Sequence, residues 1–251
     1  MNKKVCLFLS LFIMIFVKSY GLRNRNKAVK KLFKIASKKV FLTKKGKFLL
    51  FESGMSINAD GSPKAYHPQN IGLDDLAHAG KNGYWWALVT HNRKPAGTPL
   101  IQTKKNPAPG YYISTTSLFN RRKKITDPYR YVNAVKIPFI ALPLKILKST
   151  RIRLGDLAFV YHKKNKRYSY AIFADVGSNK HIGEGSIALA KKLKIPSNPR
   201  WGGVNKNIVY LIFPKSGLKR PLKKKLIIKR ARKIFIKWGG LKRFKRLIKK
   251  L

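Results

Sequence analysis

The distribution of acidic residues is the sequence feature that most constrains how this chain can fold. The 251 residues include 57 lysines and arginines but only eight aspartates and glutamates. All eight lie between Glu52 and Glu184, and the segments on either side carry basic residues alone. Composition therefore divides the chain into two basic flanks and a central segment, which contains both signs of charge and most of the glycines, prolines and aromatic residues.

The N-terminus has the pattern of a secretion signal. Lys3 and Lys4 precede an apolar run, Val5–Val17, and small residues at Ser19 and Gly21 suit cleavage after Gly21. A run of thirteen residues is shorter than the roughly 20 that span a bilayer, although an uncleaved N-terminal anchor stays open as an alternative. We therefore predict a signal peptide at 1–21 and a secreted or periplasmic protein. The single cysteine, Cys6, lies inside this signal, so the remaining chain has no disulfide and no zinc–thiolate site.

The two flanks of the central segment are strongly basic. Residues 22–47 contain eleven lysines and arginines, and apolar positions three and four apart predict an amphipathic helix there. Residues 218–251 contain sixteen and form a basic, amphipathic tail. A formal net charge of +49 attracts polyanions without any specific site. We expect contact with an anionic envelope or membrane surface, and we predict no specific nucleic-acid partner.

The two halves of the tail, which meet at a pair of glycines, are predicted to have different roles. Its apolar residues recur at helical spacing from Leu226 to Leu251, with a break at Gly239–Gly240. The part up to Trp238 is predicted to pack on the domain as a closing helix. The part beyond it is predicted to contact a polyanion or lie on an anionic membrane.

The central segment, 48–217, is predicted to be one β-rich domain. Short apolar or alternating runs bounded by Gly, Pro and Asn indicate strands, and two segments indicate short helices, with Ser186 as a cap for the second. The strands are expected at 48–51, 84–90, 111–116, 137–142, 157–161, 168–174 and 208–213, and the helices at 73–79 and 186–193. This number of short strands is typical of a barrel or sandwich.

Several motifs in this segment resemble one known family. They are Asp60-Gly-Ser-Pro-Lys-Ala-Tyr-His-Pro, Trp85-Trp86-Ala-Leu-Val-Thr, Tyr111-Tyr-Ile-Ser-Thr-Thr-Ser-Leu, Ile137-Pro-Phe-Ile-Ala-Leu-Pro, Gly155-Asp-Leu-Ala-Phe-Val-Tyr, Tyr170-Ala-Ile-Phe-Ala-Asp-Val-Gly and Ile182-Gly-Glu-Gly-Ser-Ile-Ala-Leu-Ala. In their order, from about Glu52 to Gly217, they resemble glycoside hydrolase family 75, the fungal-type chitosanases. The Asp-Val-Gly and Gly-Glu-Gly-Ser pair is the most specific part of the resemblance.

The resemblance implies a mainly β fold with a double-psi β-barrel-like core and a few short helices. It implies a secreted, inverting endo-hydrolase of β-1,4 linkages in chitosan or a related amino-sugar polymer. Asp175 and Glu184 match the two essential carboxylates, with Glu184 as general acid and Asp175 as general base. An inverting pair stands about 6.5–9.5 Å apart, which leaves room for a water molecule.

Four further residues are candidates for substrate binding. Asp156 is predicted either to bind an amino sugar or to pair with a basic side chain. Trp85 and Trp86 alternate along a strand, as do Tyr111 and Tyr112, so one ring of each pair is expected to face the core and the other is free to stack on a sugar. We expect Trp85, Trp86 or Tyr112 to serve in this way.

The remaining predictions concern metals, cofactors, the oligomeric state and an alternative function. The scattered histidines show no metal-ligand spacing, so neither a metal nor a cofactor is predicted, and the protein is expected to be a monomer that acts on a polysaccharide. The alternative function is a cationic envelope- or nucleic-acid-binding protein built on an inactive hydrolase-like barrel. The charge favours this alternative, and the retention of both carboxylates argues against it.

Overall fold

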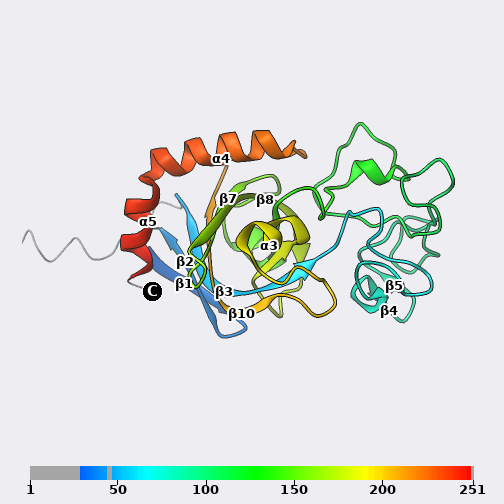
Figure 1. The fold of residues 1–251 in the computed structure, drawn as a ribbon, viewed down its shortest axis with the longest axis horizontal. Helices are drawn as coiled ribbons and strands as arrows, with labels where there is room; N and C mark the ends of the chain where they lie inside the picture. Colours follow the sequence, from blue (N-terminus) through cyan, green and yellow to red (C-terminus); the bar gives the residue numbers. More distant parts are fainter. Residues whose placement is uncertain (1–28, 44–46, 250–251) are drawn as a thin grey trace, which may run out of the picture.

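A computed structural model describes residues 29–43 and 47–249, and it is mainly β. Its centre is a closed six-stranded barrel, in which neighbouring strands follow the order β3, β10, β7, β8, β6 and β9, and a β3–β9 pairing closes the ring (Figure 1). The barrel strands are β3 (Leu49–Asn58), β6 (Phe139–Pro143), β7 (Leu157–His162), β8 (Arg167–Gly177), β9 (Glu184–Ser186) and β10 (Val204–Phe213). The expected β-rich barrel is therefore present.

The barrel mixes antiparallel and parallel neighbours. Strands β7 and β8, which correspond to the strands predicted at 157–161 and 168–174, form an antiparallel hairpin with His162 opposite Arg167 at its tip. Two pairs run parallel, β3 with β9 and β6 with β8. The interior is filled by apolar side chains, and the rings of Phe51 and Tyr210 stack there with centroids 4.5 Å apart.

The N-terminal flank is a β-hairpin, so the helix predicted within 22–47 is wrong for the part that the structure describes. Strand β1 (Val29–Ile35) pairs with β2 (Lys38–Thr43), which in turn adds to the edge of β3. The two turn residues, Ala36 and Ser37, have φ of 43° and 65°, the left-handed values that a tight two-residue hairpin turn requires. The predicted signal peptide, 1–21, lies outside the described residues.

The C-terminal flank packs on the outside of the barrel. Helix α4 (Lys224–Trp238) covers β7 and β8, as Figure 1 shows, and Phe235 stacks on Phe159 with centroids 4.0 Å apart. This confirms the closing helix. Helix α5 (Gly240–Ile248) also packs inward, since Phe244 is fully buried against Phe159. Most of the apolar side of α5 therefore packs on the domain, although Leu241 is 39% exposed. Contact of this half with a polyanion or an anionic membrane stays a prediction.

Residues 59–136 form a loop-rich lobe beside the barrel (Figure 1). The strands predicted at 84–90 and 111–116 are reduced to β5 (Tyr84–Trp85), which pairs with β4 (Gly80–Lys81), and to isolated bridges such as Leu88 with Ser114. The predicted helix at 73–79 is a short 3-10 turn, η1 (Leu76–His78), and a second turn, η2 (Pro128–Arg130), follows.

Two short α-helices connect the barrel strands. Helix α2 (Leu144–Ser149) follows β6 directly and had no sequence signal. Helix α3 (Ile187–Leu193) confirms the prediction at 186–193, because the Ser186 hydroxyl accepts the backbone N–H of Leu189 as an N-cap. Within 29–43 and 47–249, the helices are all too short or too polar to cross a membrane.

Candidate active site

The barrel places Asp175 and Glu184 on the two strands that flank β6, where both residues pair with Ala141. Asp175 lies near the end of β8 and pairs with Ala141 of β6, while Glu184 opens β9 and pairs with Ala141 from the other side. Adjacent strands are about 4.8 Å apart, so the two backbones are separated by about 10 Å. Residues in direct register project to the same face of a sheet, so both side chains leave the same surface.

The Glu184 side chain reaches across β6 toward the strand that carries Asp175. A methyl group built on Gly177 would lie only 2.9 Å from Glu184 Oε2, so this carboxylate sits over Gly177. Gly177 is two residues beyond Asp175 on β8 and therefore shares its face. Alternate residues of a strand are about 7 Å apart, so the Glu184 carboxylate lies about one such step along β8 from the Asp175 backbone. Both carboxyl groups remain partly exposed to solvent, and 19% of the Glu184 side chain is exposed.

Asp175 is held by one of its two oxygens. Its Oδ1 accepts the backbone N–H of Ser117 at 2.9 Å, the Ser117 hydroxyl at 2.7 Å and the N–H of Val176 at 2.9 Å. No hydrogen bond from the described residues engages Oδ2. Burial raises the pKa of Asp175 to about 6, the bonds from Ser117 oppose this rise, and the nearby charge of Glu184 adds to it.

Glu184 is held by donors from two different segments. Its Oε1 accepts the side-chain amide of Asn58 at 2.5 Å, and its Oε2 lies 3.7 Å from Nε2 of the exposed His181. The Glu184 carboxylate beside it raises the pKa of His181, and partial burial opposes this rise. An amide donor and an imidazolium both favour the ionised form of a carboxylate.

A third carboxyl group, Asp60, completes the site, although the sequence indicated it only as part of the first motif of the family resemblance. It follows β3, and its carboxyl oxygens accept the Tyr66 hydroxyl at 2.8 Å and the Asn58 amide at 3.0 Å. Burial raises the pKa of Asp60 well above its ordinary value, and the charges of Asp175 and Glu184 raise it further. We call Asp60, Asp175 and Glu184 the carboxyl triad.

The sequence did contain a signal for these additional residues. Asp60 and Tyr66 both belong to the first motif of the family resemblance, and Ser117 belongs to the third. Nothing in the spacing of the chain shows that these motifs meet Asp175 and Glu184, because 115 residues separate Asp60 from Asp175. The closure of the barrel brings them together.

Asp156 has a structural role, which corrects the prediction that it binds substrate or pairs with a basic side chain. Only 2% of it is exposed, and its carboxylate accepts backbone N–H groups of Arg153, Lys215, Ser216 and Gly217. The three bonds from Lys215, Ser216 and Gly217 hold the loop after β10 against the start of β7, and the bond from Arg153 closes the turn before that strand. No face of this carboxylate is available to a sugar.

The aromatic candidates divide as the alternation predicted. Trp85 and Tyr112 are partly buried against the core, with ring centroids 6.3 Å apart. Trp86 is 55% exposed, and its Nε1 donates to the carbonyl of His78. Trp86 is therefore the one of the three with a ring face free for stacking. Trp201, which the sequence analysis did not select, is 75% exposed.

In the described part of the chain, no group of three or more His, Cys, Asp or Glu side chains is arranged to hold a metal ion. No protein-family model matches the chain, and comparison with curated proteins gives no match. The function is therefore inferred from the geometry and chemistry of the carboxyl triad.

Proposed function

We propose that this protein is an inverting glycoside hydrolase with Asp175 and Glu184 as its acid/base pair. The observation that carries the proposal is the placement of the two residues on either side of Ala141, with the Glu184 carboxylate over Gly177. From this placement we infer a separation of about 7 Å between the carboxyl groups, which is in the range of inverting enzymes, whereas retaining enzymes hold theirs about 5–5.5 Å apart. Such a separation would leave room for a water molecule between the two groups.

The electrostatics favour an assignment of roles opposite to the one that the family resemblance implies. Burial, which raises the pKa of Asp175 to about 6, favours the protonated form that a general acid needs. Its Oδ2, which is free of hydrogen bonds from the described residues, is the oxygen placed to donate that proton to the leaving group. Glu184, held by Asn58 and His181, serves as the ionised base that activates water on the opposite face of the sugar.

The finer fold proposal is a double-psi barrel. Support comes from the closed ring of six strands and from its two parallel pairs, β3 with β9 and β6 with β8. Each parallel pair joins strands that are far apart in the chain, which is how this barrel type interleaves its two halves. The catalytic pair then lies beside the β6–β8 pair.

The substrate class proposed is a β-1,4-linked amino-sugar polymer. The net charge of +49 repels polycations and concentrates polyanions. Among amino-sugar polymers, this favours acetylated or acidic strands, such as the glycan of peptidoglycan, over the polycation chitosan. The export predicted from residues 1–21 would bring the enzyme to such polymers.

Hydrolysis is tested with a panel of chitosans of graded acetylation and with peptidoglycan. We expect release of reducing ends, with the product formed first in the inverted anomeric configuration, as followed by NMR. Glu184→Gln should abolish turnover. The matched control is Glu52→Gln, because Glu52 is the only other glutamate of the chain and forms a surface ion pair with Lys163. Absence of release from every polymer, or full activity of Glu184→Gln, would reject the proposal.

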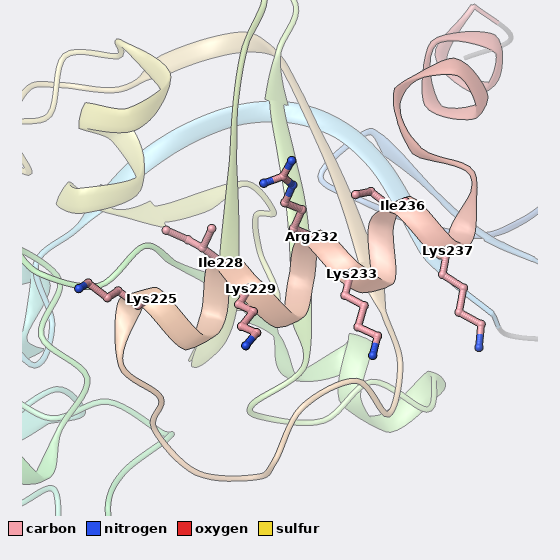
Figure 2. Close-up of a pocket in the computed structure, with 7 residues that line it drawn as sticks. All are labelled: Lys225, Ile228, Lys229, Arg232, Lys233, Ile236 and Lys237. Carbon is pink, nitrogen blue, oxygen red and sulfur yellow. The ribbon is translucent and has the colours of Figure 1, made fainter.

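A second candidate function, binding of an anionic surface, rests on the outer face of α4. Figure 2 shows this face, where five cationic side chains surround two isoleucines that remain 37% and 59% exposed. The residues are Lys225, Ile228, Lys229, Arg232, Lys233, Ile236 and Lys237. A helical stripe of cations around exposed apolar side chains suits an anionic polymer or an anionic lipid surface.

This candidate is tested by neutralising the stripe, since truncating the tail would remove the buried Phe244. Replacement of Lys225, Lys229, Lys233 and Lys237 by Gln should reduce binding to anionic vesicles and wall polymer and flatten its dependence on salt. The control replaces four exposed lysines of the lobe, Lys64, Lys94, Lys104 and Lys105, which makes the same change in net charge. Equal losses in both variants would mean that net charge, and not this face, drives the binding.

A further inference from the structure

Tyr66 links the carboxyl triad to a second, buried carboxyl group. The Tyr66 hydroxyl lies 2.8 Å from Asp60 Oδ1 and 3.5 Å from Asp74 Oδ2. Tyr66 is 2% exposed and Asp74 is 3% exposed, so water does not separate these groups readily. Beyond Asp74, the ring nitrogen Nδ1 of the exposed His78 lies 2.8 Å from Asp74 Oδ1.

The geometry around Tyr66 and Asn58 favours a neutral carboxyl group at Asp60. A tyrosine hydroxyl has a single proton and can donate it to only one acceptor. Tyr66 donates to Asp60 at 2.8 Å, whereas its distance of 3.5 Å to Asp74 is too long for a strong hydrogen bond. Asp60 also shares one donor with Glu184, because Asn58 Nδ2 contacts both carboxyl groups, and two carboxyl groups that share a site favour a proton on one of them.

The charges around the two carboxyl groups decide which one carries the proton. Asp74 is stabilised as an anion by His78, by the backbone N–H of Asp75 and by the charge of Arg200, all of which oppose the rise that burial causes in its pKa. Among the described residues no cation forms an ion pair with Asp60, and the nearby charges of Asp175 and Glu184 strengthen the rise that burial causes in its pKa. The proton therefore belongs on Asp60.

Asp60 also fixes the orientation of Asn58, the residue whose amide donates a hydrogen bond to Glu184. The backbone N–H of Asp60 donates to Asn58 Oδ1 at 2.7 Å, and Asn58 Nδ2 donates both to Asp60 Oδ2 at 3.0 Å and to Glu184 Oε1 at 2.5 Å. Asn58 is 5% exposed, so its orientation is fixed by these bonds. An amide turned the other way would present its oxygen to two carboxyl groups, and Glu184 would lose its donor.

We propose that Asp60 is a positioning residue that acts as a neutral carboxylic acid, holding Asn58 and, through it, Glu184. The inference rests on the proposed hydrolase function. A neutral Asp60 also keeps the number of negative charges in the site at no more than two. The remaining titratable groups that face Glu184 are Asp175, His181 and the buried Tyr210.

The proposal is tested by comparing two substitutions of Asp60. Asn is the neutral isostere of a protonated Asp, so Asp60→Asn should keep turnover within a factor of about ten, while Asp60→Ala should lose about 100-fold in kcat with little change in KM, because Glu184 is misplaced. If Asp60→Asn is as inactive as Glu184→Gln, Asp60 reacts as a carboxylate and the proposal is overturned. Full activity of Asp60→Ala would overturn it equally.

Tyr66→Phe removes only the hydroxyl that joins the two carboxyl groups. We expect it to lower kcat by several-fold to about tenfold with little change in KM, as expected for a lost positioning bond. Tyr131→Phe is the matched control, because Tyr131 is also buried and its hydroxyl also donates, but to the carbonyl of Ile125 away from the triad. Equal kcat values for the two variants would contradict a role for Tyr66 in holding Asp60.

A readout that needs no activity separates this inference from the proposed function. The chain has only two glutamates, Glu52 and Glu184, so labelling glutamate with carboxyl carbon-13 gives two NMR signals. If Asp60 is neutral, Asp60→Asn removes no charge, and the titration midpoint of Glu184 stays the same relative to that of Glu52. A shifted midpoint would overturn the proposal, and this result stands even if no glycan is hydrolysed.

Discussion

Gly177→Ala tests the geometry of the proposed catalytic pair without replacing either carboxylate. The added methyl group would lie 2.9 Å from Glu184 Oε2 and 4.0 Å from the Ala141 side chain. Ordinary van der Waals contact begins at 3.4 Å, so the carboxylate has to retreat by about 0.5 Å. It cannot do this freely, because Asn58 holds its other oxygen at 2.5 Å.

The expected cost follows from the displacement. A misplacement of 1 Å in an active site can lower the rate about 100-fold, so half of that predicts a roughly tenfold loss in kcat, or about 1.4 kcal/mol of barrier. Gly177 does not have the left-handed φ that favours glycine. Alanine in a strand should therefore raise the free energy of unfolding by about 0.5–1 kcal/mol. The variant should be slower and at least as stable.

The assay pairs initial rates of reducing-end release with urea denaturation of the same preparations. Gly83→Ala is the control, because it should show the opposite pattern. Gly83 has φ of 76°, and no atom lies within 4 Å of its added methyl group, so alanine there should cost about 1 kcal/mol of stability and leave the rate intact. If Gly177→Ala keeps wild-type turnover, the Glu184 carboxylate does not work from the position over Gly177, and the separation of about 7 Å loses its basis.

Three further predictions concern the acid, its charge and the C-terminal helices. If Asp175 is the proposed general acid, its pKa of about 6 means that kcat/KM should fall as pH rises through about 6. Ser117→Ala should move this fall to higher pH, since Ser117 stabilises the charged form. A flat profile would remove Asp175 from this role. A folded-state pKa above the unfolded one means that wild-type stability increases as pH falls from about 6 toward 3.8 and is lower above that window. Asp175→Asn should therefore abolish turnover yet unfold at higher urea than the wild type at pH 8, by on the order of 1 kcal/mol, and equal or lower stability would contradict the raised pKa. Phe244→Ala should cost about 3–5 kcal/mol in urea unfolding, while Leu241→Ala, at a 39% exposed position of the same helix, should cost under about 1 kcal/mol.

The sequence was informative where a local pattern has one physical outcome. The polar segment between two apolar runs at 157–161 and 168–174 had to become a hairpin, because its strands are adjacent in the chain. Ser186 had to cap the following helix, because its hydroxyl supplies the acceptor that the first turn lacks. Periodicity also placed one face of the closing helix, α4, against the domain.

Periodicity failed where two structures share the same spacing. In the N-terminal flank, apolar residues at helical intervals also fit a two-residue period, and the residues buried there, Ile35 and Val40, lie on opposite strands of a hairpin. The unpaired edge of β3 decided the outcome, because it offers backbone hydrogen bonds that a lone helix would not use. Likewise, the exposed aromatic patterns of the lobe became isolated bridges, since no neighbouring strand lies beside them for long enough.

The sequence by itself determined the candidate pair, Asp175 and Glu184, and the β-rich nature of the domain that carries them. Both could be recognised because the few carboxylates, and the alternation of apolar and polar residues along the strands, can be read directly from the sequence. Only the tertiary structure decided that Asp60, Asn58 and Ser117 join the pair, and that Asp156 is a buried anchor for backbone N–H groups. The physical reason is closure of the barrel: the β3–β9 pairing brings the end of β3 to the start of β9, and the burial and charge that set the chemistry of each carboxyl group exist only after that closure.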